Sequence, residues 1–212
     1  MQNEGSRKII VAVAPVGAEI KPPSENPLTP EDVAGEVIAC AEAGAGMVHL
    51  HVRDREGNQT ENISDFSKTL DIIRQSSDII IQGSTGGLST LTLEQRCVAV
   101  NDPRVEVASL NMGSVNFGED VYINRFYLTT MLKVDIDWGV VHDNMMDLSL
   151  LATAIGLGAT VVRVGFEDSV YYAPGIAAKH NQELVKKIVS LIDHIGLEVA
   201  SPSEARTILG IV

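Results

Sequence analysis

The sequence of 212 residues contains no long hydrophobic run, although 45% of its residues are hydrophobic. A membrane-spanning helix needs about 20 consecutive apolar residues, so we expect no such helix. The first ten residues, MQNEGSRKII, lack the apolar core of a secretory signal peptide. Together these absences predict a soluble, cytoplasmic protein.

Cysteine and positive charge are also scarce. Cys40 and Cys97 are far apart and show no metal-binding spacing, which is typical of reduced cysteines in a cytoplasmic chain. Acidic residues number 28 against 16 Lys and Arg, for a formal net charge of −12. Nucleic acids and anionic membranes would not be attracted to such a surface, so we expect neither as a partner.

What the sequence does contain is a regular alternation of apolar strands and helical patterns. Six stretches are predicted to be strands: 8–20, 46–54, 78–87, 105–118, 134–144 and 160–168. Four residues are predicted to cap or start helices between and after them: Thr29, Ser64, Thr92 and Ser201. Repeated strand–helix units imply an α/β domain with a parallel sheet and right-handed crossovers.

Polar residues gather just after the predicted strand ends. They are Glu19, the stretch 49–54, the stretch 83–87, the stretch 109–114, the stretch 142–144, and Glu167 with Asp168. In parallel α/β folds ligands bind at the carboxyl ends of the strands. This placement predicts an enzyme.

His49 and His51 lie two residues apart in the strand MVHLHVRD. Side chains alternate along a strand, so both imidazoles can face one cavity and bind one ion. The spacing alone leaves two alternatives open, a metal site or an ordinary pair of histidines at a strand end. A catalytic zinc ion typically has three protein ligands and an open position, so a third ligand would favour the metal.

The stretch RVGFED at 163–168 supplies a third candidate. Arg163, Gly165 and Glu167 are expected to alternate onto one face, with Glu167 towards the histidines and Asp168 at the edge of the loop. The alternative is a pair of acids that are merely solvated at a strand end. An inward-facing arginine beside two acids argues against this, because a buried guanidinium requires paired partners.

Three further stretches carry polar groups that either belong to a functional site or have only a structural role. The turn GSTGG at 83–87 offers backbone N–H groups and two hydroxyls that suit a carboxylate or phosphate, or it is only a turn. Ser109 and Asn111 lie on one side of their segment, where they either line a site or have a structural role. His142 belongs to a chemical site or precedes a helix cap made by Asp143 or Asn144, and we favour a cap and a site-lining role over metal binding.

Taken together and in order, the stretches PVGAEI, HLHVRD, GSTGG, SLNMGSVNFGEDV and VRVGFEDSVYY resemble the β-keto acid cleavage enzyme family, whose named member acts in lysine fermentation. The resemblance implies a TIM (β/α)8-type barrel with one zinc ion. It implies that His49, His51 and Glu167 are zinc ligands, that Asp168 is the general base, and that Arg163 orients that base. The substrate-binding residues implied in the same way are Ser84, Thr85, Gly86 and Ser109 for the carboxylate, and Glu19 and Asn111 for the distal end of the pocket.

The resemblance also implies a reaction, a cleavage of a β-keto acid with acetyl-CoA as co-substrate. Zinc would act as a Lewis acid and lower the pKa of the α-carbon, from which Asp168 would remove a proton. The enolate would attack the thioester of acetyl-CoA. The released CoA thiolate would then cleave the adduct into acetoacetate and a new acyl-CoA, without a redox cofactor.

The chain departs from this family in length. A full barrel needs eight strand–helix units and about 250 residues, and we expect a single domain over 1–212 that lacks about two units near 126–134. An unclosed parallel sheet leaves two edges, which self-association into a homo-oligomer would cover. Two alternative functions stay open: another metal-dependent aldolase or lyase that does not use CoA, and a non-catalytic remnant that binds partners.

Overall fold

The computed structural model describes residues 7–18, 20–86, 90–109, 115–117, 120–122 and 137–211. Its main sheet has seven strands, six of them in the order β4-β3-β2-β1-β8-β7, and β11 pairs with the start of β1. Every pairing within this sheet is parallel. The strands are β1 Lys8–Val13, β2 Met47–Leu50, β3 Ile80–Gly83, β4 Val107–Ala108, β7 Gly139–Val141, β8 Val161–Val164 and β11 Glu198–Val199.

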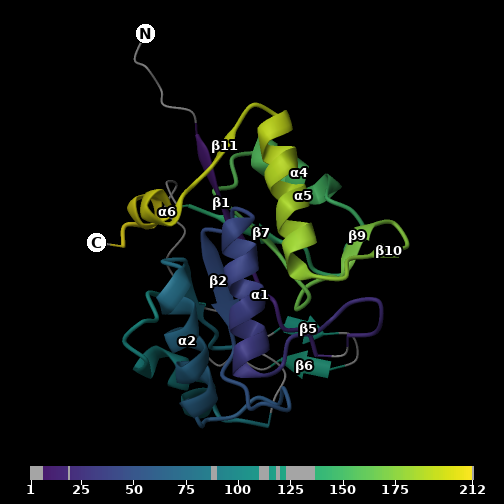
Figure 1. The fold of residues 1–212 in the computed structure, drawn as a ribbon. Helices are drawn as coiled ribbons and strands as arrows, with labels where there is room; N and C mark the ends of the chain where they lie inside the picture. The colour runs from purple at the N-terminus through teal and green to yellow at the C-terminus, as the bar shows by residue number, and fades with distance from the viewer. Residues whose placement is uncertain are drawn as a thin grey trace.

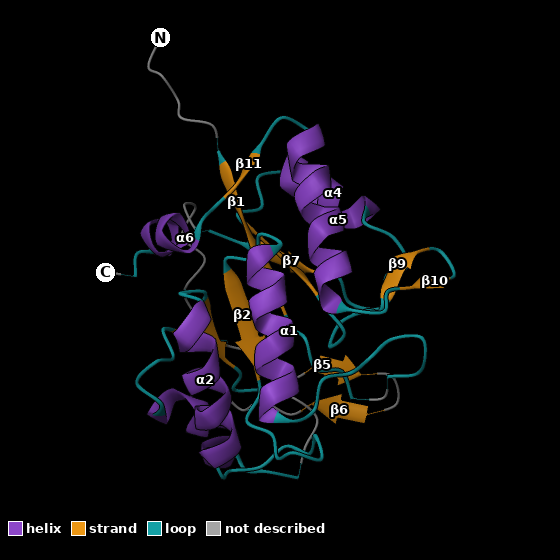
Figure 2. Ribbon diagram, viewed as in Figure 1, coloured by secondary structure: helices purple, strands orange, loops and turns teal. Residues whose placement is uncertain are grey.

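Helices α1, α2 and α5 stand side by side in front of the sheet in Figure 1, and Figure 2 shows the strands behind them. The helices are α1 Pro30–Glu42, α2 Ser64–Ser76, α3 Leu93–Arg96, α4 Ser149–Gly156, α5 Asn181–His194 and α6 Pro202–Leu209, with a 3-10 turn over Cys97–Asn101. Two small antiparallel pairs complete the described elements: β5 Val115–Phe117 with β6 Asp120–Tyr122, and β9 Tyr171–Ala173 with β10 Ile176–Ala177.

The central strand β1 is buried on both faces, which its unbroken apolar sequence predicts. Ile9, Val11 and Val13 pack in the large core between the sheet and the helices. Ile10 and Ala12 face the other way, into a smaller core that also contains residues of β2, β3 and α6. This second face corresponds to the interior of a barrel, and α6 packs against it near the amino ends of the strands.

The architecture confirms the predicted fold class, a TIM-type arrangement that lacks about two strand–helix units. All six predicted strands contribute to the sheet, although each contributes fewer residues than predicted. The two-residue strand β11 was not predicted. The stretch 126–134, where we expected the missing units, lies outside the described residues. Within the described ranges, no helix is long and apolar enough to cross a membrane.

Three of the four predicted helix starts are confirmed by side-chain caps. Thr29, Thr92 and Ser201 each accept a hydrogen bond from a backbone N–H in the first turn of α1, α3 and α6. The prediction for Ser64 was wrong, because Ser64 is the first residue of α2 rather than its cap. The residue at the N-cap is Ile63, and the Ser64 N–H donates to Oδ1 of Asn62 at 3.0 Å.

Candidate metal centre

Three side chains converge at the carboxyl ends of β2 and β8. His49 and His51 direct Nε2 towards the same carboxylate oxygen, Oε1 of Glu167, at 3.4 Å and 3.3 Å. Each of the three residues offers one ligand atom, and these atoms all lie within 4.8 Å of one another. The His49 side chain is only 3% exposed and that of His51 10%, so the cluster is shielded from bulk water. This geometry can hold a metal ion.

Strand order explains how residues so far apart in sequence meet. β2 and β8 both pair with β1, one on each side, so the ends of the two strands reach the same edge of the sheet. His49 and His51 share a face because they lie two residues apart on extended backbone, as the spacing predicts. The T-shaped contact between their rings, with centroids 5.3 Å apart, follows from this arrangement.

Glu167 reaches the histidines by a different route from the one expected. β8 ends at Val164, so Glu167 does not continue a strand alternation from Arg163. The chain turns at Gly165, whose φ is +137° and whose carbonyl accepts the N–H groups of Asp168 and Ser169. The Glu167 N–H donates to the Ala14 carbonyl at 3.1 Å. A turn fastened to β1 therefore positions the carboxylate.

The electrostatics of the cluster favour an ionised Glu167. Burial opposes ionisation, but the two imidazoles outweigh it and hold the pKa of Glu167 well below its usual range. Burial also lowers the pKa of His51, although Glu167 opposes that shift. A carboxylate beside neutral imidazole is the protonation state that a divalent cation requires of these ligands.

Asp168 lies beside the cluster and is bound by Arg163 through two hydrogen bonds. Nε and Nη2 of Arg163 donate to the two carboxylate oxygens at 2.9 Å and 2.5 Å, and Nη2 also donates to Glu167 at 3.4 Å. Burial and the neighbouring Glu167 raise the pKa of Asp168 to about 6, while Arg163 opposes the shift. Burial alone would lower the pKa of Arg163, but Asp168 and Glu167 outweigh this effect and raise it. The predicted acid–arginine group is therefore buried and paired rather than solvated.

The glycine-rich turn follows β3 and lies against the end of β4. The Thr85 N–H donates to Oγ of Ser109 at 3.1 Å, and the Thr85 hydroxyl donates to the Ser109 carbonyl at 2.5 Å. Ser84 is buried, and its hydroxyl accepts from the Gly86 N–H at 3.3 Å. Four of the six residues predicted to bind substrate are thus adjacent. The other two, Glu19 and Asn111, lie outside the described residues.

The helix cap expected from Asp143 or Asn144 was wrong, although the Asn144 N–H donates to the carbonyl of Asp168 at 3.0 Å and so lies beside the site. The helix after β7 begins at Ser149, and Asp147 rather than Asp143 or Asn144 accepts its first N–H, at 2.8 Å. Val141 pairs in register with Arg163, so the next residue, His142, belongs to the helix-facing side of the sheet. There its Nε2 lies 2.9 Å from the Asp147 carbonyl oxygen. His142 therefore does not line the metal centre.

Sequence reasoning missed Gln82, which faces the centre from β3. Its Oε1 lies 2.8 Å from Nδ1 of His49. The available signal was its position in the strand DIIIQG, where one polar side chain interrupts an apolar run. By contrast, Arg53 and Asp54, directly after the histidines, make hydrogen bonds within the loop after β2. Arg53 donates to the Gly57 carbonyl at 2.8 Å, and Asp54 accepts the Asn58 N–H at 2.9 Å.

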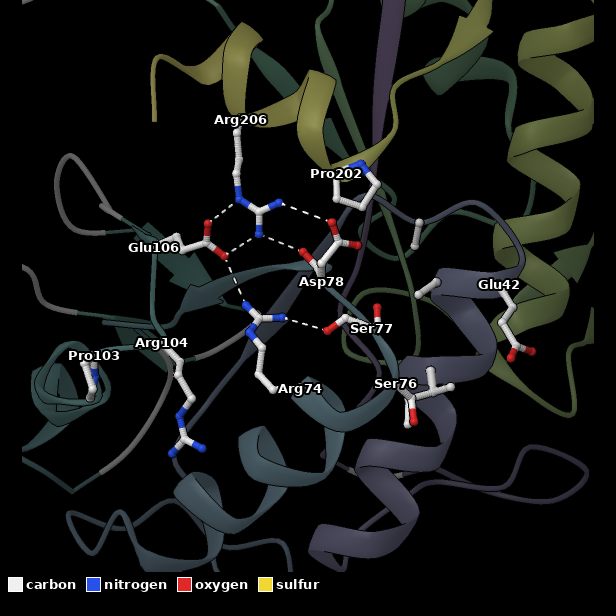
Figure 3. Close-up of a pocket in the computed structure, with 13 residues that line it drawn as sticks. Glu42, Arg74, Ser76, Ser77, Asp78, Pro103, Arg104, Glu106, Pro202 and Arg206 are labelled. Carbon is white, nitrogen blue, oxygen red and sulfur yellow. Dashed lines mark hydrogen bonds and ion pairs between the residues drawn. The ribbon is translucent and has the colours of Figure 1, made fainter. Parts of the chain in front are cut away.

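A hollow of about 790 Å³ lies at the opposite end of the strands (Figure 3). Glu106 lies there between two arginines, at 2.5 Å from Nε of Arg206 and 3.1 Å from Nη2 of Arg74. Arg206 also donates to the Asp78 carbonyl at 2.7 Å. These pairs join α6 to the starts of β3 and β4. Charges already paired at the amino ends of barrel strands are typical of a stabilising contact rather than a reaction centre.

Comparison with known proteins points to one family. The family model described as "beta-keto acid cleavage enzyme" matches residues 8–134 and 126–211. The 3-keto-5-aminohexanoate cleavage enzyme of Acetoanaerobium sticklandii is 33% identical over 270 residues, covering 96% of this chain and 98% of the relative. The 3,5-dioxohexanoate:acetyl-CoA acetone transferase of Paraburkholderia graminis is 25% identical over 298 residues, covering 96% of each chain.

A solved structure shares the fold. The ternary complex of ObcA with a C4-CoA adduct and oxalate superposes with a TM-score of 0.70 at 15% identity, covering 87% of this chain and 67% of that one. Both sequence alignments are longer than the 212 residues of this chain, so parts of those relatives have no counterpart here.

Proposed function

The chain belongs to the beta-keto acid cleavage enzyme family, and on that premise we propose that it is a zinc-dependent acyltransferase. It converts a β-keto acid and acetyl-CoA into acetoacetate and a new acyl-CoA. The observation that carries this proposal is the convergence of His49, His51 and Glu167 beside the buried Arg163–Asp168 pair. The name of the relative from P. graminis, an acetyl-CoA acetone transferase, supports the choice of co-substrate.

Two of the three separations between the ligand atoms support zinc. Two ligands of a tetrahedral zinc ion, each about 2.0–2.1 Å from it, are about 3.3 Å apart. The two distances from the imidazoles to Glu167 are 3.3 Å and 3.4 Å. Two histidines and one glutamate also form a known catalytic zinc set that keeps one position open. A zinc ion bound here supplies Lewis-acid chemistry to substrate oxygens.

Asp168 is the base that takes the α-proton of the β-keto acid. A base is most effective when its pKa lies near the working pH, and burial brings that of Asp168 to about 6. Arg163 holds both carboxylate oxygens and so fixes the direction from which the proton is removed. Because Asp168 is only 8% exposed, bulk water does not compete for this proton.

The substrate carboxylate is held by the turn after β3 and by Ser109. Hydrogen bonds within the turn hold Thr85 against Ser109 and Gly86 against Ser84, and the hydroxyl groups of Ser84 and Ser109, which accept these bonds, can donate their own hydrogens to a carboxylate at this edge of the sheet. Donors of this kind bind carboxylates. Glu19 and Asn111 are proposed for the distal end of the pocket, on the strength of their motifs alone.

The carbon–carbon exchange balances without an oxidant or reductant. The enolate carbon attacks the acetyl carbonyl of acetyl-CoA, and the CoA thiolate leaves with the electron pair of the C–S bond. That thiolate then attacks the original keto carbon, and the bond from this carbon to the α-carbon breaks. The α-carbon takes back the proton held by Asp168, which yields acetoacetate, while the original acyl group leaves as acyl-CoA.

We further propose that residues 1–212 form one domain, and that the two strand–helix units it lacks would belong near residues 126–134. The family match breaks into two stretches that overlap there, which supports this location. Self-association would cover the outer sides of β4 and β7, each of which pairs with a single described strand. A role in lysine fermentation is proposed on the resemblance of the sequence motifs alone.

The test of the proposed function is a product assay with the full chain loaded with Zn²⁺. A panel of β-keto acids is incubated with and without acetyl-CoA, and acetoacetate and acyl-CoA are quantified by mass spectrometry. We expect equal amounts of the two products, and only when acetyl-CoA is present. Turnover that does not need acetyl-CoA would indicate an aldolase or lyase instead, and zinc binding without turnover would indicate a non-catalytic remnant.

A further inference from the structure

Gln82 and His49 are direct neighbours across two parallel strands. Their Cα atoms are partners in the register of β2 with β3, so both side chains point to the same face of the sheet. That face is the interior one, which Met47 and Ile80 continue towards the small core. The register of β2 with β3 thus places the Gln82 amide beside the His49 imidazole.

The contact involves the ring nitrogen that does not face Glu167. Oε1 of Gln82 lies 2.8 Å from Nδ1, while Nε2 of the same ring lies 3.4 Å from Glu167. A carbonyl oxygen can only accept, so Nδ1 must carry a hydrogen in this arrangement. In neutral imidazole the other nitrogen then has a free lone pair, and it is directed into the cluster.

The remaining partners of the two histidines differ. Nε2 of His51 lies beside Glu167, and burial lowers the pKa of His51. Nδ1 of His49, by contrast, lies beside the neutral amide of Gln82. Many metal-binding histidines instead donate to a carboxylate, which adds a negative charge to the site. Among the residues that the structure describes, Glu167 and Asp168 are the acids that lie beside the histidines, and Arg163 is paired with both.

We propose that Gln82 is a positioning residue of the metal centre. It fixes His49 as the tautomer with hydrogen on Nδ1, orients the ring so that Nε2 is the metal ligand, and does so without adding charge. The inference rests on the proposed function only in taking His49 as a ligand. Gln82 itself contacts neither the metal nor the substrate.

The test compares Gln82→Met with Gln82→Glu. Methionine preserves volume but offers only a weak acceptor, whereas glutamate keeps an acceptor oxygen and adds a charge. The exposed Gln75→Leu on α2 is the control. Two readouts are taken for each protein: the tautomer of His49 from long-range ¹H–¹⁵N spectra of the zinc-free full chain, and the affinity for Zn²⁺ by competition with a chromophoric chelator.

In the parent protein and in Gln82→Glu we expect the hydrogen of His49 on Nδ1. In Gln82→Met we expect a mixture of tautomers and Zn²⁺ affinity about 10- to 100-fold lower, the loss usual for an outer partner of a ligand. Gln82→Glu should bind Zn²⁺ at least as tightly as the parent protein. An unchanged tautomer and affinity in Gln82→Met would overturn the inference.

Two additional results keep the test decisive. If Gln82→Met does not fold, the parent spectrum decides alone, because hydrogen on Nε2 of His49 would refute the proposed role. The variant His49→Ala separates this inference from the proposed function. If His49→Ala binds Zn²⁺ normally, the metal centre itself is wrong; if it loses Zn²⁺ while Gln82→Met does not, only the role of Gln82 is wrong.

Discussion

Nε2 of His51 lies 3.3 Å from Oε1 of Glu167, although 116 positions of sequence separate the two residues and β1 lies between β2 and β8, the strands that they follow. Gly165 lets the chain after β8 turn back towards β1, where the Glu167 N–H donates to the Ala14 carbonyl at 3.1 Å. The candidate metal centre is thus a consequence of the strand order β2-β1-β8 and of this turn.

Glu167→Gln should remove metal binding without unfolding the protein. An amide is a poor ligand for zinc, and it no longer supplies the negative charge that faces the two imidazoles. We expect Zn²⁺ affinity to fall by more than about 100-fold, beyond the loss caused by an outer partner. Titration with Zn²⁺ checks this, with the exposed Glu61→Gln as control. Unchanged affinity would exclude Glu167 as a ligand.

Asp168→Asn should separate metal binding from turnover. The amide keeps the size of the side chain but cannot take the α-proton, so the rate should fall by about 10²- to 10⁴-fold. Zinc content should stay at the level of the parent protein, because Asp168 is not one of the three converging ligands. The control is Asp193→Asn on the exposed side of α5. A nearly normal rate in Asp168→Asn would contradict its role as base.

Gly165→Ala should disrupt the turn that carries Glu167 and Asp168. A Cβ atom there would overlap the backbone carbonyl of Ala14, and the φ of +137° is unfavourable for an L side chain. We expect the free energy of unfolding to fall by about 3 kcal/mol or more, with loss of Zn²⁺ binding. Gly175→Ala is the matched control, since its φ is +75° but nothing lies within 4 Å of the added atom.

For Gly175→Ala we expect a loss of only about 1 kcal/mol, the usual penalty of left-handed backbone. Urea unfolding followed by circular dichroism measures both variants. Equal losses in the two would mean that the close approach to Ala14 does not matter.

Acid should weaken the protein through Asp102. Hydrogen bonds from Arg104 and Ser67 lower the pKa of Asp102 to about 2, from an ordinary value of 3.8, although burial opposes them. A group with a depressed pKa stabilises the folded state above its ordinary pKa, and the stabilisation is lost as pH falls through the folded value. The contribution of Asp102, about 2 kcal/mol, should therefore be complete at pH 5 and disappear between about pH 4 and pH 2.

The variant Asp102→Asn measures this directly. Its free energy of unfolding should be lower than that of the parent protein at pH 5, and the two values should approach each other towards pH 2. Asp193→Asn, at an exposed position, serves as control. A difference that stays constant over this range would show that the ionised form of Asp102 is not what stabilises the fold.

Much of the candidate site could be predicted because it depends on simple periodicities. The two-residue spacing of His49 and His51 places both on one face, and parallel strands bring their carboxyl ends to one edge. The route of Glu167 could not be predicted, because a turn at Gly165 looks in sequence like a continuing strand. Gln82 was missed since its importance depends on register with β2, which one sequence does not reveal.

The fold was predicted in outline and missed in detail for similar reasons. The strand–helix alternation indicates a parallel sheet, but β11 has only two residues and is too short to show any period. The start of α2 was misplaced by one residue because serine favours the N-cap, whereas the residue at the N-cap is Ile63, which no capping preference indicates.

The central claim is that His49, His51 and Glu167 bind one zinc ion, and elemental analysis of the purified full chain tests it most directly. The parent protein and His49→Ala are equilibrated with equal Zn²⁺, freed of excess metal, and measured for zinc per chain. We predict one zinc ion per chain in the parent protein and none in His49→Ala. One zinc ion per chain in His49→Ala, or none in the parent protein, would contradict the assignment of this centre.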